Sequence, residues 1–358
     1  MPSSSHRSGK LRLLKVASGK TLRFFLAKQS LFRLAHIPKG TKRGVMFQSI
    51  SAMLNRLWAQ PYLVLSAAAL FWAGNFVVGR WATAAGVSEL PPIQLAFLRW
   101  SLACLLTLPF AMPALRRDWP KLTSSRRQLA RTLILAILGY SSFNTLLYLG
   151  LKDSSVANAA ILSSALPALV ALIVVLLFRE RLGLIPALGV TLCIAAVWFT
   201  QSQGSLSAMV NFRLNPGDGF VILSALAYSL YTALLRWRPE QITALGFVMA
   251  LMLLGTGLLA PVALLEFLYS GARFPLDRAE VWLALLYVAT FPSAIAALCW
   301  NRGIQLIGAA RGGVFVTLIP LFAALLSWLL LGETLRLYHL LGLCGLVIGI
   351  VLVNARQR

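Results

Sequence analysis

From Pro61 onward, long apolar stretches alternate with short polar breaks along the whole chain. A helix needs about 20 apolar residues to cross a bilayer core of about 30 Å. Glycine and proline inside the stretches are compatible with membrane helices. The pattern predicts an all-α membrane protein with ten transmembrane helices, at 61–80, 92–112, 130–150, 156–178, 182–201, 218–236, 242–266, 281–301, 308–331 and 337–354.

Composition excludes an ordinary soluble domain. Hydrophobic residues make up 59% of the 358 residues and charged residues 12%, whereas a soluble domain is about 45–50% apolar and about 25% charged. The net charge of +23, from 33 basic and 10 acidic residues, would suggest nucleic acid in a soluble protein. In a membrane protein it is an orientation signal that also favours anionic lipid.

The positions of the charges decide between these interpretations. If the N-terminus is cytoplasmic, 26 of the 33 basic residues fall on the cytoplasmic side of a ten-helix chain. This bias predicts a multi-pass protein of the cytoplasmic (inner) membrane with both termini inside. It excludes nucleic acid as a partner, because no basic domain stands apart from the bilayer.

Residues 1–60 hold twelve Lys or Arg and no acid, since the first acid is Glu89. We expect a basic, disordered cytoplasmic tail without a function of its own. A basic amphipathic helix on the membrane, an organelle-type targeting peptide, or sequence upstream of the true start remain alternatives. The role of residues 1–45, and whether they belong to the mature protein, is left open.

The second half of the chain repeats the first. Residues 144–200 align without a gap with 297–353, at an offset of 153, and near the start of each half the offset is about 156. Each predicted repeat, 61–201 and 218–354, has five helices, so the second enters the membrane upside down. Inverted repeats are typical of alternating-access carriers with a site at the midplane. The matched residues include Gly150 with Gly303, Pro167 with Pro320, Glu180 with Glu333, Gly189 with Gly342, Asn75 with Tyr231 and Arg80 with Arg236.

Four sequence runs resemble a known family: FWAGNFVVGR at 71–80, LAFLRW at 95–100, and the helix ends near LLFRERL and LLLGETL. They are similar to the drug/metabolite transporter superfamily, in particular its EamA-type branch. The resemblance implies a ten-helix inner-membrane carrier for amino acids, nucleobase-like compounds, other metabolites or toxic cations, usually acting in efflux. The chain departs from the pattern at Arg179, where the family usually has glycine.

Polar and aromatic side chains within the predicted helices are the candidates for a substrate cavity. Groups at membrane depth are costly and usually face a cavity or another helix, and several here share a helical face. Aromatic faces suit apolar or cationic groups, and amides can donate and accept. The candidates are Trp72, Asn75, Arg99, Tyr140, Asn144, Tyr148, Asn158, Tyr228, Tyr231, Trp300, Asn301 and Thr317, with Ser293, Ser163, Ser164 and Ser224 as weaker ones.

Each candidate also has a structural interpretation. Serine and threonine in such helices usually bond their own backbone, and Tyr148 and Trp300 could anchor helix ends at the interface. Arg99 is the only basic residue well inside a predicted helix. It could bind an anionic group of a substrate, or hold another helix through backbone carbonyls. Helices five and ten are poor in polar groups, and we expect them to be scaffold.

Four residues are candidates for gates or hinges: Pro167, Glu180, Pro320 and Glu333. Each proline is predicted mid-helix, where it frees a carbonyl and allows either a hinge or a static kink. The glutamates end helices four and nine, and could form gates or plain ion pairs with neighbouring arginines.

Other function classes have weaker support. His6, His36 and His339 are scattered, so no enzyme is predicted, and neither a cofactor nor a metal is expected. The four cysteines look like small buried hydrophobes. A channel or a non-transporting receptor or scaffold is the alternative to a transporter. Proton coupling through Glu266 is one option beside uniport and exchange, and the oligomeric state is open.

Overall fold

The computed structural model describes residues 57–84, 89–179, 183–205, 215–239, 241–270, 274–275, 277–307, 315–316 and 318–353. The chain divides into two units, Met1–Ala59 and Gln60–Arg358, and the fold below is that of the second. The predicted basic tail lies outside the described residues except for 57–60.

Every described element is helical. The first half contains α3 (Pro61–Thr83), α4 (Pro92–Leu122), the continuous run α5 (Arg126–Ala136), η1 (Ile137–Ser142) and α6 (Phe143–Leu151), then α7 (Val156–Ser164), α8 (Leu166–Phe178) and α9 (Leu184–Gln201). The second half contains α11 (Pro216–Leu234), η2 (Leu235–Trp237), α12 (Ala244–Tyr269), the run α13 (Ala279–Thr290), η3 (Phe291–Ile295) and α14 (Ala296–Ile307), then α16 (Leu318–Leu331) and α17 (Leu337–Val353).

Local sequence explains many of the helix starts. Proline occupies the first turn of α3, α4 and α11, where its missing N–H costs nothing. Ser125, Ser155 and Thr243 cap α5, α7 and α12 by accepting a hydrogen bond from a backbone N–H three residues on, as capping residues typically do.

Six helices of the described part are long and apolar enough to cross a membrane, and α7 and α8, bent by 41°, add a seventh if the two together form one span. Three shorter apolar helices, α9, α16 and α17, complete the set. The multi-pass helical class is therefore confirmed, whereas the number of ten spans stays a prediction.

Two predicted spans differ from the structure. α4 continues to Leu122, past the predicted end at 112, so that Arg116, Arg117 and Lys121 lie on a helix and not in a loop. Pro109 and Pro113 do not end it, since membrane helices accommodate proline. The predicted fourth helix is broken between α7 and α8.

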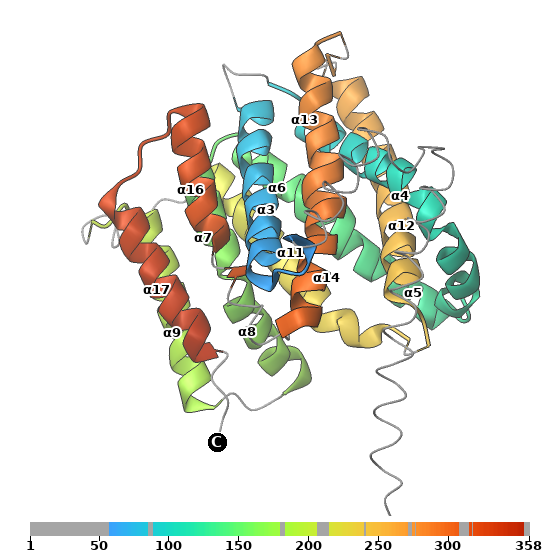
Figure 1. Cartoon of the computed structure of the whole chain (residues 1–358), viewed down its shortest axis with the longest axis horizontal. Coiled ribbons are helices and arrows are strands. Elements are labelled where there is room, and N and C mark those ends of the chain that lie inside the picture. Colours follow the sequence, from blue (N-terminus) through green and yellow to red (C-terminus); the bar gives the residue numbers. More distant parts are fainter. Residues whose placement is uncertain are drawn as a thin grey trace, which may run out of the picture. The chain divides into compact units, whose positions relative to one another are not determined.

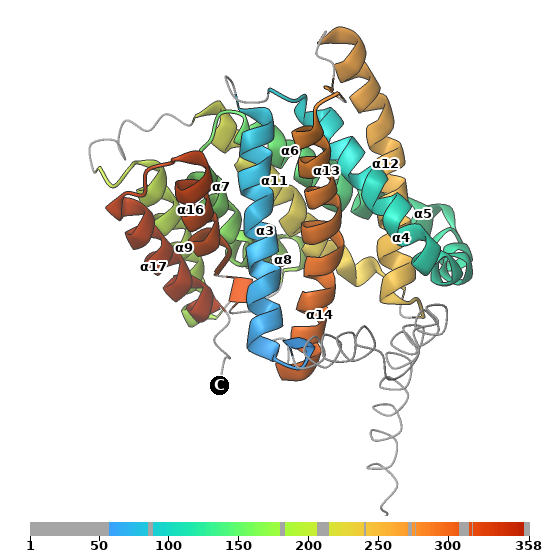
Figure 2. The ribbon, with the colours of Figure 1, turned by 45° about the horizontal axis from the view of Figure 1, so that its top comes forward.

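Two pairs of equivalent helices, α9 with α17 and α4 with α12, pack against each other in an antiparallel manner. Figure 1 shows α9 and α17 side by side at one edge and α4 and α12 toward the opposite edge, where α5 also lies, with most of the other helices between the two pairs. Figure 2 shows the same order from a second direction. The sequence expectation of peripheral helices five and ten corresponds to α9 and α17, which pack mainly on each other.

Contacts between α9 and α17 exchange in the manner of a two-fold axis. A Cβ on Gly342 would lie 1.9 Å from Thr200 Oγ1, and a Cβ on Gly189 would lie 2.5 Å from the backbone nitrogen of Val353. Gly189 and Gly342, and likewise Thr200 and Val353, are partners at the repeat offset. Gly189 of the first half thus contacts Val353 of the second, and Gly342 of the second half contacts Thr200 of the first. Such an exchange of equivalent contacts makes the interface self-complementary. The pair α9 and α17 therefore has approximate two-fold symmetry, as expected if the two halves are inverted repeats.

α4 and α12 close each other's N-termini. The Asp118 carboxylate, near the end of α4, accepts a hydrogen bond from the Thr243 backbone N–H (2.8 Å) at the start of α12, and another from the Thr243 hydroxyl. Glu266, near the end of α12, accepts from the backbone N–H groups of Ile93 (3.3 Å) and Gln94 (2.7 Å) at the start of α4. A carboxylate at a helix N-terminus meets free N–H groups and the positive end of the helix dipole. Glu266 therefore fixes the packing of two spans.

Replacing Gly189 with alanine tests the close approach of α9 and α17. The new methyl group would overlap backbone atoms of α17, which cannot rotate away, so we expect a loss of about 1–3 kcal/mol of stability. The matched control is Gly257→Ala in α12, where a Cβ meets no atom within 4 Å. The control should be neutral or stabilised by up to about 1 kcal/mol. Thermal unfolding of the purified protein in detergent measures both. Equal midpoints for the two variants would contradict the tight packing.

Candidate functional site

The guanidinium of Arg99 is the centre of a buried polar cluster inside the spanning helices. Arg99 is 4% exposed. Its Nη1 donates to Asn75 Oδ1 (2.8 Å), Asn144 Oδ1 (2.6 Å) and the Tyr148 hydroxyl (2.8 Å), and its Nε donates to Ser293 Oγ (3.1 Å). These five residues are called the Arg99 cluster below. They are brought together from α3, α4, α6 and η3, and therefore from both halves of the chain.

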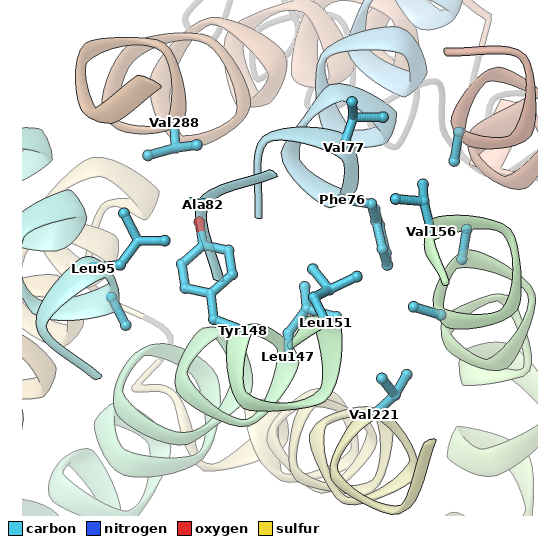
Figure 3. Close-up of a cluster of buried hydrophobic side chains, with 14 of the residues drawn as sticks. Phe76, Val77, Ala82, Leu95, Leu147, Tyr148, Leu151, Val156, Val221 and Val288 are labelled. Carbon is cyan, nitrogen blue, oxygen red and sulfur yellow. The ribbon is translucent and has the colours of Figure 1, made fainter. Parts of the chain in front are cut away.

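The Arg99 cluster is closed by a further bond and by an apolar surround. The Tyr148 hydroxyl donates to Asn75 Oδ1 at 2.8 Å, so Tyr148 both accepts from Arg99 and donates to its neighbour. Figure 3 shows Tyr148 pointing away from α6 among apolar side chains that include Phe76, Leu95 and Val288. Tyr148 has no exposed surface. The alternative of an interfacial anchor is therefore wrong for this residue.

All four partners of Arg99 are neutral oxygens. Within the described residues the only ion pairs are Arg80 with Glu333 and Arg117 with Asp118, so no carboxylate there neutralises Arg99. Burying an unpaired charge is costly even when hydrogen bonds are provided. The expectation that Arg99 holds another helix through backbone carbonyls is not what the structure has, because the contacts are with side chains.

Two π-helical segments flank the Arg99 cluster at equivalent points of the repeat. η1 covers Ile137–Ser142 and η3 covers Phe291–Ile295. Tyr140 of η1 and Ser293 of η3 are partners at the offset of 153. Tyr140 contacts the ring of Trp100, with 5.0 Å between centroids, while Ser293 bonds to Arg99. Single π-helical turns are rare and frequently mark functional sites.

An aromatic cluster adjoins the Arg99 cluster. It consists of Trp100, Tyr140, Phe143, Tyr228 and Tyr231, joined ring to ring with centroids 4.5–6.2 Å apart. The guanidinium of Arg99 lies 4.9 Å from the Trp100 ring centroid, at cation–π distance. Trp100 Nε1 is buried and has no hydrogen-bond partner in the described part of the chain.

Glycine makes the ring packing feasible. A Cβ on Gly139 would lie 2.7 Å from the Tyr231 ring, and one on Gly255 would lie 2.6 Å from the Tyr140 Cβ. Side chains larger than hydrogen at these two positions would push the rings of the aromatic cluster apart.

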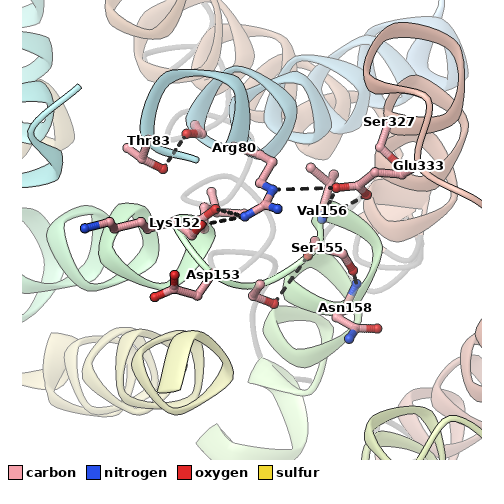
Figure 4. Close-up of polar contacts among 12 residues, drawn as sticks. Arg80, Thr83, Lys152, Asp153, Ser155, Val156, Asn158, Ser327 and Glu333 are labelled. Atoms are coloured by element: carbon pink, nitrogen blue, oxygen red, sulfur yellow. Dashed lines mark hydrogen bonds and ion pairs between the residues drawn. The ribbon is translucent and has the colours of Figure 1, made fainter. Parts of the chain in front are cut away.

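A second polar site lies at the ends of α3, α7 and α17. Its centre is Glu333, whose carboxylate accepts from the backbone N–H of Val156 at the start of α7 (3.1 and 3.2 Å). Arg80 lies 3.9 Å from Glu333 and donates to the carbonyls of Leu151 (3.0 Å) and Lys152 (2.6 Å). Figure 4 shows these contacts together. They border a surface pocket of about 420 Å³, which also includes Asp153, Ala157, Asn158, Arg336 and His339. We call this region the Glu333 pocket.

The predicted site residues separate into groups. Asn75, Arg99, Asn144 and Tyr148 meet in the Arg99 cluster, and Tyr140, Tyr228 and Tyr231 in the aromatic cluster. Trp72 and Trp300 pack on each other at 5.4 Å, and Trp72 Nε1 donates to the Pro292 carbonyl of η3 (3.1 Å). Thr317 and Glu180, and the side chains of Asn301 and Pro167, lie outside the described residues.

Three expectations are corrected. Asn158 lies in the Glu333 pocket, with its Oδ1 3.3 Å from His339 Nε2, and not in the central cluster. Pro167 and Pro320 are in the first turns of α8 and α16, not in the middle of described helices. Proline there replaces N–H groups that would be unpaired anyway. Ser164 bonds the Ala160 carbonyl of its own helix, as the structural interpretation held. Ser224 instead donates to the Phe143 carbonyl of α6, and Ser163 has no partner among the described residues.

Trp100 is the central residue that sequence reasoning missed. It belongs to the same LRW run as Arg99, which is the signal that could have identified it.

No three His, Cys, Asp or Glu side chains gather as metal ligands within the described residues.

Tyr148→Phe tests the cluster as a stabilising network. The change removes a hydroxyl that accepts from Arg99 and donates to Asn75, while both partners keep other bonds. We expect the free energy of unfolding to fall by about 1 kcal/mol. Tyr269→Phe, at a residue that is 84% exposed, is the matched control and should not change the unfolding midpoint. If Tyr148→Phe is also unchanged, the network does not stabilise the bundle.

Comparisons with known proteins agree with this architecture. The model of the EamA-like transporter family matches the chain twice, at residues 60–201 and 215–355. The chain is 24% identical to the uncharacterized transporter YyaM of Bacillus subtilis, with 81% of this chain and 92% of that protein covered. It is 28% identical to an uncharacterized transporter of Archaeoglobus fulgidus, with 84% and 99% covered.

Two further similarities are more distant. The WAT1-related protein At3g02690, chloroplastic, of Arabidopsis thaliana is 27% identical, with 62% of this chain and 54% of that protein covered. A solved crystal structure superposes with a TM-score of 0.55 at 19% identity, covering 82% of this chain and 95% of that one. The double family match extends over most of the sequence, and the chain belongs to the EamA-like transporter family.

Proposed function

We propose that the protein is a secondary transporter that moves a small solute through the centre of its helical bundle by alternating access. The Arg99 cluster carries this proposal. It gathers polar side chains within spanning helices, where they are costly and typically functional. Residues of both halves build it, as expected for a carrier whose halves move around a shared site.

The antiparallel pairing of equivalent helices supports an inverted arrangement of two five-helix repeats, 61–201 and 218–354. Contacts at the ends of the helices support the orientation. Lys121 donates to the Gln241 carbonyl (2.8 Å), and Arg131 lies over the ring of Trp237 (5.5 Å), so basic residues of the first half lie against the connection between α11 and α12 at one end of the bundle. By the positive-inside rule, this end of the bundle faces the cytoplasm. In the proposed orientation both termini are also cytoplasmic, and the membrane is the inner membrane. We propose outward transport.

Substrate contacts are assigned to the two central clusters. Arg99, Asn75, Asn144 and Tyr148 provide the polar contacts, and the aromatic cluster with Tyr140, Tyr228 and Tyr231 provides an apolar wall. Trp72 and Trp300, next to η3, line the same path. A substrate bound here lies between the halves, so it can be exposed to either side when they tilt.

Glu333 is the proposed outer gate. It joins the end of α16 to the N-terminus of α7, and Arg80 of α3 supports the joint. These contacts close the outer end of three helices with one carboxylate. Breaking them needs no change in any helix, which suits a contact that opens once in each cycle.

Flux measurements on the purified protein in liposomes test transport itself. A broad panel of labelled amino acids, nucleobases, organic acids and amines is supplied, and uptake is compared with and without the same unlabelled solute inside. A carrier shows saturable uptake that internal solute accelerates, whereas a channel shows no such acceleration. A receptor or scaffold gives no flux. The absence of flux for the whole panel would contradict the proposal.

Glu333→Gln tests the gate. The change weakens the contacts with Val156 and Arg80, so we expect the outer end to open more often. Ala157 is buried beneath this joint at 3% exposure. In a background whose other cysteines are removed, Ala157→Cys should react with a membrane-impermeant maleimide at least several-fold faster with Glu333→Gln. Asp153→Cys, at an exposed position of the same pocket, is the control and should react equally in both. An unchanged rate at position 157 would remove Glu333 from the gate.

A further inference from the structure

We infer that the substrate of this transporter is an organic anion, with a carboxylate bound by Arg99 and a flat apolar group against the aromatic cluster. This inference rests on the proposed function and adds the chemical class of the substrate. The observations that carry it are the charge at the site, its unused donors and its aromatic wall.

Among the described residues, the charge of Arg99 has no anionic partner. Arg99 is buried within the spans, and each of its four hydrogen-bond partners is a neutral oxygen. Asp118 and Glu266, the acids on α4 and α12, are bound at the two ends of that helix pair to Thr243 and to the N-terminus of α4. A buried guanidinium is stabilised when an anion joins it. An anionic substrate would supply the missing charge each time it binds.

The donors at the site point to the same conclusion. A guanidinium carries five N–H groups, and the hydrogen bonds described above use those on Nη1 and Nε. Within the described residues, Nη2 makes no hydrogen bond, and the neighbouring Trp100 Nε1 is buried without an acceptor. Both are pure donors. A carboxylate is an acceptor-only group that a guanidinium edge can bind through two bonds.

The neutral side chains around Arg99 hold its guanidinium in position to bind a carboxylate. Asn75, Asn144 and Tyr148 all contact Nη1, which restrains the guanidinium while leaving its charge uncompensated. If the role of Arg99 were only to tie helices together, an aspartate among these side chains would serve it better than an amide. The aromatic cluster begins at the Trp100 ring, 4.9 Å from the guanidinium carbon, so a ring attached to the carboxylate would lie against Trp100 and Tyr140.

Three probes of one shape and different charge test the inference. Benzoate, benzamide and benzylammonium share a phenyl ring and carry charges of −1, 0 and +1. Binding to the purified protein in phosphatidylcholine nanodiscs is measured by equilibrium dialysis and by the shift in unfolding midpoint, at constant ionic strength. We expect benzoate to bind and to raise the midpoint, and the other two to do neither. Within the series acetate, benzoate and 2-naphthoate, affinity should rise with the apolar group.

Two variants connect binding to the cluster. Asn144→Asp places a carboxylate 2.6 Å from Nη1 with little change of shape. We expect it to be at least as stable as the parent and to weaken benzoate binding about tenfold or more, because the site then holds its own anion. Arg99→Gln should abolish benzoate binding. Gln241→Glu, at an exposed position, adds the same charge at the surface and should leave benzoate binding unchanged.

The outcomes separate this inference from the proposed function. If carboxylates of the series do not bind, or if benzamide or benzylammonium binds as well as benzoate, the inference is overturned. The same holds if Asn144→Asp retains parental affinity. Flux of neutral or cationic solutes without carboxylate binding would leave the proposal of transport standing and would contradict the inference of an anionic substrate. Charge-selective binding of benzoate without flux of any solute would support the anion site and contradict transport.

Discussion

A guanidinium inside a membrane bundle must be surrounded by acceptors, and much of this structure follows from that requirement. Arg99 donates hydrogen bonds to acceptors on three other segments. These are Asn75 on α3, Asn144 and Tyr148 on α6, and Ser293 on η3. Moving any of these segments away would leave a buried charge short of hydrogen-bond partners, at a cost of several kcal/mol. The cluster therefore fixes where the two halves of the chain meet.

Around this centre, small residues and carboxylates set the helix packing. Lipid tails provide no hydrophobic drive for association, so close van der Waals contact must do so. Glycines such as Gly150, whose added Cβ would lie 2.6 Å from Val221, allow that approach. Carboxylates act at the ends, where Asp118, Glu266 and Glu333 each accept from the N-terminus of another helix. Glu266 was the acid that sequence reasoning proposed for proton coupling. Because it holds α4 in place, a protonation cycle there would loosen the pair α4 and α12.

The sequence predicted the helices, the repeat and most members of the Arg99 cluster, because hydrophobic runs and spacings of three and four residues are local properties. The sequence could not predict which polar helix faces come together in the folded protein. Asn75 and Asn158 look alike in sequence, yet one bonds to Arg99 and the other lies beside His339. The π-helical turns η1 and η3 have no clear compositional signal, and they set the directions of Tyr140 and Ser293. The span predicted to end at residue 112 continues to Leu122, because the length of a helix beyond the apolar run depends on tertiary packing.

The repeat is symmetric in its scaffold and asymmetric at its centre, and the contrast has a physical reason. Contacts such as Gly189 with Val353 and Gly342 with Thr200 are exchanged between the halves. In the proposed cycle, this symmetry would make two tilted states of the bundle close in energy. At the centre the equivalents differ, because Asn144 matches Ala297, Asn75 matches Tyr231, and Tyr140 matches Ser293. A solute with one polar and one apolar end has no two-fold symmetry. In the proposed transport cycle, a site with a guanidinium on one side and tyrosines on the other would hold such a solute in a single orientation, while the symmetric scaffold would expose it to either side of the membrane.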